Sequence, residues 1–157
     1  MDVKALILDP IANMPVVILR DEDGSHFLPI WVGVFEANAI ALQMEGIATP
    51  RPMTHDLLRN LLAKFEAHVV KVVINNLLEN TFYAEIHLTL DGRAMTLDSR
   101  PSDAIALALR AGAPVFVEEE VLARSIANDD PSEVQSSERL KKWLEQVDPD
   151  SLGKYRM

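Results

Sequence analysis

The segment 81–112, TFYAEIHLTLDGRAMTLDSRPSDAIALALRAG, decides the fold because its hydrophobic period changes partway along. Its first ten residues alternate between two kinds of side chain, apolar Phe82, Ala84, Ile86, Leu88 and Leu90 and more polar Tyr83, Glu85, His87 and Thr89. This alternation predicts a strand with one buried face. Asp91-Gly92 is typical of a hairpin turn, and residues 93–98 then return as a second strand. Ser102 is the predicted cap of an apolar helix that ends near Gly112.

The same order of elements is predicted in the first half of the chain. Apolar runs predict three strands at 3–9, 16–20 and 27–32, and a helix at 34–45 closed by Gly46. In the second half, a further apolar run at 68–76 predicts the strand that precedes the hairpin. Each half therefore reads strand-strand-strand-helix. A connecting helix runs from a cap at Thr54 to about residue 66, with an apolar face formed by Leu57, Leu58, Leu61, Leu62 and Phe65.

An internal duplication explains this repeated order. Ala39-Ile40-Ala41-Leu42 recurs as Ala104-Ile105-Ala106-Leu107, a shift of 65 residues. The same shift places core strand residues on one another, Ile30 on Met95 and Val32 on Leu97. The alternative is chance, since such a tetrapeptide is common in buried helices. We expect an α+β fold with a duplicated strand-strand-strand-helix repeat, a connecting helix and a C-terminal helical tail.

The chain divides into a domain at 1–127 and an acidic tail at 128–157. A short strand at 115–117 and a helix at 118–126 close the domain, and Asp130, Pro131 and Glu133 predict the start of a final helix. The 157 residues suffice for one core, and the absence of cysteine excludes disulfides and thiolate zinc sites. With no signal sequence or membrane span, we expect a soluble, cytoplasmic protein without a membrane partner. The net charge of −9 argues against a large basic surface, so a nucleic-acid partner would need local arginines or a bridging cation.

The two repeat helices are apolar on nearly every side. In the second, Asp103 and Arg110 are the only ionisable residues, and they lie seven apart along one line. Such a helix must be covered on a second side, either by the other repeat or by another subunit. We therefore expect a homo-oligomer, with a dimer favoured and a trimer left open.

Two similar helix entrances are the first candidate site. Arg51-Pro52-Met53-Thr54-His55-Asp56 and Arg100-Pro101-Ser102-Asp103 both place arginine and proline before a hydroxyl residue and an aspartate. Free amides and a guanidinium at a helix start can hold a phosphate. The alternative is structural, because the same residues rigidify and cap a helix.

Glu36 is the second candidate, since it places a carboxylate in the first turn of a mostly apolar helix. It can ligate a divalent cation or serve as a base, or it can simply complement the helix dipole. Asp98, at the end of a predicted strand, would lie beside the second entrance. No nucleophile elbow, phosphate-binding glycine loop, dinucleotide fingerprint or paired histidine motif is present in the sequence.

Three segments together resemble the bifunctional nuclease family. They are Leu28-Pro29-Ile30-Trp31-Val32-Gly33 with Glu36-Ala37, Arg51-Pro52-Met53-Thr54-His55-Asp56-Leu57-Leu58, and Ser99-Arg100-Pro101-Ser102-Asp103-Ala104-Ile105-Ala106-Leu107-Ala108. The resemblance covers about residues 3–126. It implies an α+β fold, frequent oligomers and hydrolysis of phosphodiester bonds in DNA and RNA.

On that basis we form a hypothesis for the mechanism. A divalent cation, Mg²⁺ or Mn²⁺, bound near Glu36, Asp98 or Asp103 would polarise a phosphodiester, and no organic cofactor is expected. The predicted substrate-binding residues are Arg51, Thr54, Arg100 and Ser102, and the predicted catalytic residues are Glu36, His55 and Asp103. The alternative is a non-catalytic oligomeric module that binds a small anionic ligand or a protein partner.

Overall fold

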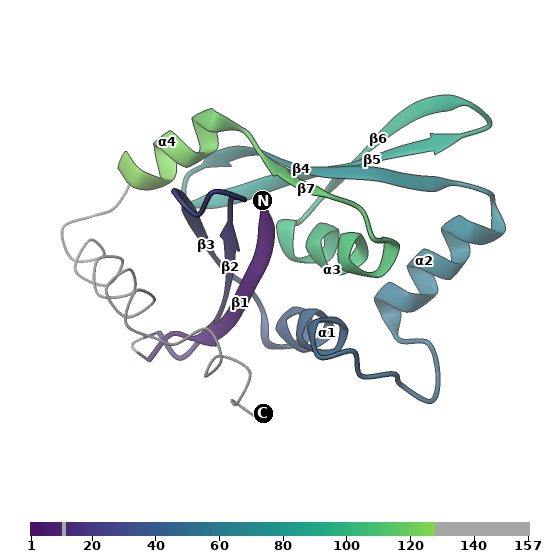
Figure 1. Ribbon diagram of the computed structural model, residues 1–157, viewed down its shortest axis with the longest axis horizontal. Coiled ribbons are helices and arrows are strands. Elements are labelled where there is room, and N and C mark those ends of the chain that lie inside the picture. The colour runs from purple at the N-terminus through teal and green to yellow at the C-terminus, as the bar shows by residue number, and fades with distance from the viewer. Residues whose placement is uncertain (11, 128–157) are drawn as a thin grey trace.

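An antiparallel sheet, a mixed sheet and a layer of helices make up the structure (Figure 1), a computed structural model that describes residues 1–10 and 12–127. The first sheet has the order β1-β2-β3, with β1 (Asp2–Leu8), β2 (Pro15–Arg20) and β3 (Phe27–Trp31). The second has the order β6-β5-β4-β7, with β4 (His68–Leu78), β5 (Thr81–Leu90), β6 (Arg93–Ser99) and β7 (Val115–Val117), and only β7 runs parallel to its neighbour. The helices are α1 (Val34–Met44), α2 (Thr54–Lys64), α3 (Pro101–Ala111) and α4 (Glu119–Ala127).

The β5–β6 hairpin confirms the alternation in the sequence. Ala84, Ile86 and Leu88 are buried, whereas the side chains between them are partly or fully exposed. Asp91 and Gly92 both have positive φ, 50° and 72°, as a tight hairpin turn requires. The α+β class is therefore confirmed, and the predicted tail helix lies outside the described residues.

Helix α3 is enclosed within the chain. Residues 104–108 are all buried, because α3 packs on β4 and β5 on one side and on α1 and α2 on the other (Figure 1). The fold itself therefore supplies the second cover that its apolar sequence demands. Oligomerisation stays a prediction that needs a separate reason.

Helix α2 leaves most of its predicted apolar face uncovered within the described residues. No residue of α2 is buried, and Leu57, Leu58 and Leu61 are exposed, as is Phe65 at its C-cap. Only Leu62 packs against the core. An amphipathic pattern predicts an apolar face without saying which surface covers it.

The helix caps also differ from the prediction. Met53 and Arg100 occupy the N-cap positions of α2 and α3, so the expectation that Thr54 and Ser102 cap these helices is wrong. In α3, Pro101 takes the first helical position that its fixed φ favours, which moves the cap back to Arg100. In α2, the Asp56 carboxylate accepts a hydrogen bond from the Met53 backbone N–H (2.9 Å) and closes the start of the helix.

The duplication is not confirmed in detail. Both halves have three antiparallel strands followed by an 11-residue helix, but α1 and α3 begin 67 residues apart, not 65. Ile30 and Val32 are buried, whereas Met95 and Leu97 are half-exposed, so their equivalence as core positions is wrong. The two hairpins have turns of different length, which breaks a constant shift. A common origin of the halves stays a prediction. Within the described ranges, no helix is long and apolar enough to span a membrane.

Candidate functional site

The N-terminal turns of α1, α2 and α3 meet at one place. They bring together Glu36 from α1, His55 from α2, and Arg100 and Asp103 from α3. Glu36 and Asp103 each stand three positions after their N-cap, where a carboxylate complements the positive end of the helix dipole. We call these four side chains the helix-start cluster.

Arg100 is the centre of the helix-start cluster. Its Nε donates to Asp103 Oδ2 (2.7 Å) and its Nη2 donates to Glu36 Oε1 (2.8 Å). Asp103 uses its other oxygen, Oδ1, to accept from His55 Nε2 (2.9 Å). A continuous chain of hydrogen bonds thus links α1 and α2 to α3, which follows them in the sequence after three strands.

The charges of the cluster follow from these bonds. Burial would raise the pKa of the Asp103 carboxyl, but hydrogen bonds from Arg100 and His55 outweigh burial and hold this pKa below its ordinary value. The pKa of Glu36 is lowered by a hydrogen bond from its own backbone N–H and by Arg100. The pKa of Arg100 is raised by its bonds to both carboxylates. Both acids are therefore ionised and the guanidinium is charged at neutral pH.

The tautomer of a neutral His55 is set by its partner. Because the ionised Asp103 can only accept, His55 Nε2 must carry a proton, and a neutral imidazole then presents its lone pair at Nδ1. The His55 side chain is 12% exposed, while that of Arg100 is 65% exposed. The cluster therefore offers an accessible cation beside a largely covered imidazole.

Gly33 gives the Glu36 carboxylate its space. A Cβ built on Gly33 would lie 2.2 Å from Glu36 Oε2. Any larger residue at the N-cap of α1 would push this carboxylate from its place beside Arg100.

A second ion pair lies deeper between the same helices. Arg110, whose side chain is 3% exposed, donates from Nε to Asp56 Oδ1 (2.6 Å). Its other two nitrogens donate to backbone carbonyls, Nη1 to Ala106 (2.9 Å) and Nη2 to Ala39 (3.0 Å). The pKa of Asp56 is lowered, first by the Met53 N–H and then by Arg110. The position of Arg110 on the line of Asp103 was visible in the sequence, but its partner on α2 was not.

The other predicted site residues stand apart from the helix-start cluster. The exposed Arg51 side chain forms no hydrogen bond or ion pair within the described part of the chain, where only its backbone carbonyl accepts from Thr49 Oγ1. Asp98 is exposed on β6, paired in register with Glu85. Thr54 is exposed at the first position of α2, and Ser102 is buried. The two entrances thus do not form one symmetric anion site.

The fit to a metal ion is incomplete. Carboxylates are ligands that Mg²⁺ and Mn²⁺ accept, and the helix-start cluster holds two of them. However, both are bonded to Arg100, and residues 1–10 and 12–127 contain no group of three or more His, Cys, Asp and Glu side chains able to hold a metal ion. The residues present do not form a ready metal site, so we derive no step through one.

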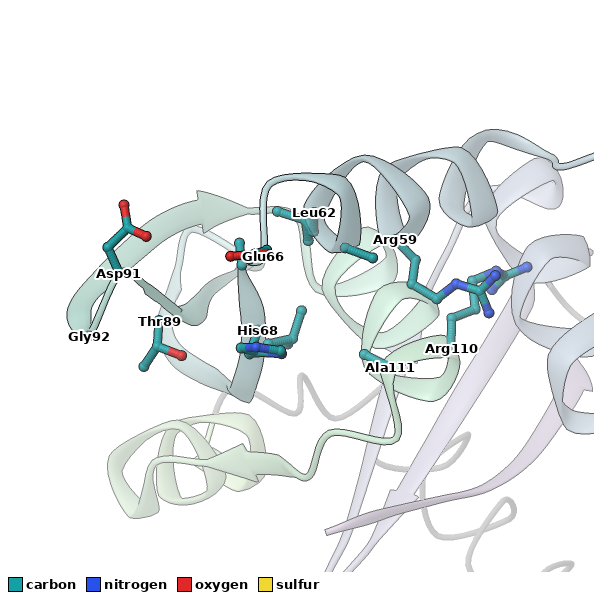
Figure 2. Close-up of a pocket in the computed structure, with 12 residues that line it drawn as sticks. Arg59, Leu62, Glu66, His68, Thr89, Asp91, Gly92, Arg110 and Ala111 are labelled. Carbon is teal, nitrogen blue, oxygen red and sulfur yellow. The ribbon is translucent and has the colours of Figure 1, made fainter.

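A cavity of about 860 Å³ lies elsewhere, between the C-terminal part of α2 and the β5–β6 turn (Figure 2). Arg59 and Arg110 lie together at one end, and Asp91 and Gly92 lie at the other. None of the four cluster residues lines this cavity. Its walls carry both signs of charge, so its volume alone assigns it no ligand.

Comparison with known proteins identifies the class. The bifunctional nuclease domain matches residues 17–129, most of the 157 residues, so the chain belongs to the bifunctional nuclease domain family. An uncharacterised protein of Mycobacterium tuberculosis is 42% identical over 149 residues, 89% of each chain. Bifunctional nuclease 2 of Oryza sativa subsp. japonica is 32% identical over 123 residues, and bifunctional nuclease 1 of Arabidopsis thaliana is 28% identical over 114. These matches cover 76% and 70% of this chain but only 36% and 35% of the plant proteins.

Proposed function

We propose that this protein is a nuclease that hydrolyses phosphodiester bonds in DNA and RNA at the helix-start cluster. The observation that carries the proposal is the hydrogen-bonded chain His55–Asp103–Arg100, in a chain of the bifunctional nuclease domain family. It combines a group that moves protons, a carboxylate that orients it and a cation beside it. Phosphodiester hydrolysis uses these three roles.

Arg100 is the proposed phosphate ligand. A guanidinium has five N–H donors, and the two hydrogen bonds to Glu36 and Asp103 leave three of them unused. The exposed side chain can donate these to the oxygens of a phosphodiester, while the N-termini of three helices add positive potential. Glu36 and Asp103 hold the guanidinium in place for this contact.

His55 is the proposed general base. Its Nδ1 accepts a proton from a water molecule as the water oxygen forms a bond to phosphorus. The bond from phosphorus to the leaving oxygen then breaks, and that oxygen takes a proton from solvent or from His55. Asp103 keeps the imidazole in the tautomer that this step needs and stabilises it when protonated.

The charge of the site sets a condition on this chemistry. Two carboxylates and one guanidinium leave a formal charge of −1 when His55 is neutral, which opposes a phosphate. A divalent cation brought in with the substrate would offset it, since Mg²⁺ commonly binds one or two carboxylates together with substrate phosphates. A requirement for Mg²⁺ or Mn²⁺ is therefore part of the proposal, as is cytoplasmic activity on nucleic acid.

The test is cleavage of end-labelled single- and double-stranded DNA and RNA by highly purified protein, with Mg²⁺, with Mn²⁺ and with chelator. We expect His55→Gln to reduce the rate about 10²–10⁴-fold, and Arg100→Ala to reduce it about 10²-fold. Arg124→Ala is the matched control, because this arginine lies on α4 and pairs with Glu120. Its activity should equal that of the wild type.

Two outcomes would contradict nuclease activity at this cluster, and a third would contradict only the metal requirement. Cleavage that survives in both His55→Gln and Arg100→Ala would place the chemistry elsewhere or in a contaminant. Absence of cleavage, combined with oligonucleotide or phosphate binding that Arg100→Ala abolishes, would support the alternative of a non-catalytic binding module for anionic ligands. Activity that chelator leaves unchanged would remove the metal ion but keep the cluster.

A further inference from the structure

The four open edges of the two sheets are not equally protected. Proteins shield edge strands from pairing with other chains by bulges, prolines or short length. Three of the edges follow this rule: β1 has a register shift between Val3 and Ala5, β3 contains Pro29, and β7 has three residues. The fourth edge, β6, has none of these features.

Strand β6 is regular, long and exposed. It pairs with β5 over seven consecutive residues without a register shift, and its first six residues are exposed. Figure 1 shows the β5–β6 hairpin projecting beyond the helix layer. Its outer row of backbone N–H and C=O groups is therefore free of any neighbouring strand within the described residues.

The middle of β6 is apolar on one side. Met95 and Leu97 stand opposite Leu88 and Ile86 in the register, so they extend the core face of this sheet. Both are nevertheless 46% exposed. An edge strand with uncovered apolar side chains at its centre is a surface on which another strand can pair.

The sequence of β6 identifies the partner as a second copy of the same strand. Arg93-Ala94-Met95-Thr96-Leu97-Asp98-Ser99 is self-complementary about Thr96. We propose that β6 of two chains pair antiparallel about a twofold axis at Thr96, which joins two four-stranded sheets into one. In this register Met95 lies opposite Leu97 of the second copy, and Leu97 lies opposite its Met95.

The apolar pairs favour this register over its neighbours. In the register about Thr96, Arg93 faces Ser99 of the second copy, and Asp98 faces Ala94, so no like charges stand opposite one another. A slip of one residue can place Arg93 opposite Asp98, but Met95 then faces Thr96 and Leu97 faces Ala94. A slip of two residues toward the N-terminus places Leu97 opposite Arg93, and a slip of two the other way places Met95 opposite Ser99. Each slip of two leaves one apolar pair, Met95 with the Met95 of the second copy or Leu97 with its Leu97, in place of two pairs worth about 0.2–1 kcal/mol each. A closed isologous contact of this kind gives a dimer and not an open fibre.

The exposed stripe of α2 is the competing surface for a second copy. It is apolar, but the helix carries no pattern that fixes a partner or an orientation. The strand edge does both, because the pairing is antiparallel and only the register about Thr96 pairs Met95 with Leu97 twice. The experiment must therefore tell β6 from α2.

The natural absence of cysteine makes the test direct. In the proposed dimer, two copies of Thr96→Cys face each other with Cβ atoms about 4.5–5.5 Å apart, close to the spacing of about 3.5–4.5 Å in disulfides. Two copies of Ala94→Cys, or of Asp98→Cys, are offset by four residues, about 14 Å along the strand. All three positions are exposed, so the full-length variants should fold.

We expect wild-type protein to show twice the monomer mass of 17.5 kDa by light scattering at micromolar concentration. Under mild oxidation Thr96→Cys should form a disulfide dimer, while Ala94→Cys and Asp98→Cys should each remain uncrosslinked. A mixture of the last two, after subunit exchange, should crosslink. Thr96→Lys should be monomeric, because it places like charges opposite one another across the axis.

A monomeric wild type would overturn the proposal. So would a dimer in which Thr96→Cys forms no disulfide, or one that survives Thr96→Lys, since the contact would then lie on another surface such as α2. Equal crosslinking of all three cysteine variants would show random collision. None of these outcomes depends on nuclease activity, so this proposal and the proposed function can fail separately.

Discussion

Replacing Arg110 with methionine should destabilise the fold far more than the same replacement at Arg100. Methionine keeps much of the buried volume, so the change removes mainly the three polar contacts of Arg110 with Asp56, Ala39 and Ala106. Breaking a buried ion pair by removing one partner costs about 3–5 kcal/mol. Asp56 is 22% exposed and keeps its bond from the Met53 N–H, which places the expected loss near 3 kcal/mol, the lower end of that range.

Arg100→Met is the matched control because it too removes a guanidinium that is ion-paired, in this case with Glu36 and Asp103. The side chain of Arg100 is 65% exposed, and such pairs contribute about 0–1 kcal/mol. The assay is urea unfolding followed by circular dichroism at pH 7. With a slope of about 1–3 kcal/mol per molar urea, the midpoint should fall by about 1–3 M for Arg110→Met. At the same slope, the fall for Arg100→Met should be smaller.

A double variant separates the ion pair from packing. Adding Asp56→Asn to Arg110→Met should recover part of the loss, because it removes the carboxylate left without its guanidinium. Equal midpoints for Arg110→Met and Arg100→Met would refute the reasoning. They would mean that water replaces the lost contacts and that the buried Arg110 guanidinium contributes no more to the free energy of unfolding than the exposed Arg100.

Further predictions concern pH, the N-cap of α1 and the tail. The folded-state pKa values of Asp56 and Asp103 are lowered, so both carboxylates contribute stability that is present above the unfolded pKa of about 3.9 and lost as pH falls below it. Asp103→Asn should therefore flatten the decline in urea midpoint between about pH 5 and pH 2. An unchanged slope would contradict the pairing of Asp103. Gly33→Ala should reduce nuclease activity by displacing Glu36, with a change of less than about 1 kcal/mol in unfolding free energy, and full activity would disprove that the carboxylate matters. Removal of residues 128–157 should leave the circular dichroism of the core intact, since the main apolar cluster joins strands and helices from both halves of residues 1–127; an unfolded product would place the tail in the core.

Local patterns were sufficient to predict most of the elements. The alternation in β5, the Asp91-Gly92 turn and the glycine after α3 each act over a few residues, so the sequence contains what the local structure needs. The start of α3 was misplaced for an equally local reason, since Pro101 takes the first helical position and shifts the cap from Ser102 to Arg100.

The tertiary arrangement was less predictable. His55 and Asp103 are 48 residues apart, and no local rule says that two helix starts meet. Their approach depends on how α2 lies across α3, which Arg110 and Asp56 fix from within. Arg51 carried the same motif but precedes the helix on an exposed stretch, where its side chain reaches none of the cluster. The exposure of the apolar face of α2 likewise depends on which elements pack against this helix, and local patterns do not specify that.

The four residues of the helix-start cluster come from both halves of the chain. Glu36 and His55 precede β4, while Arg100 and Asp103 follow β6, so neither half alone possesses both the imidazole and the guanidinium. If the halves arose from one ancestor, they have since become complementary, each supplying what the other lacks. A chain severed between α2 and β4 would therefore regain the site only through association of its two fragments, and such reassembly would report directly on the docking of α1 and α2 against α3.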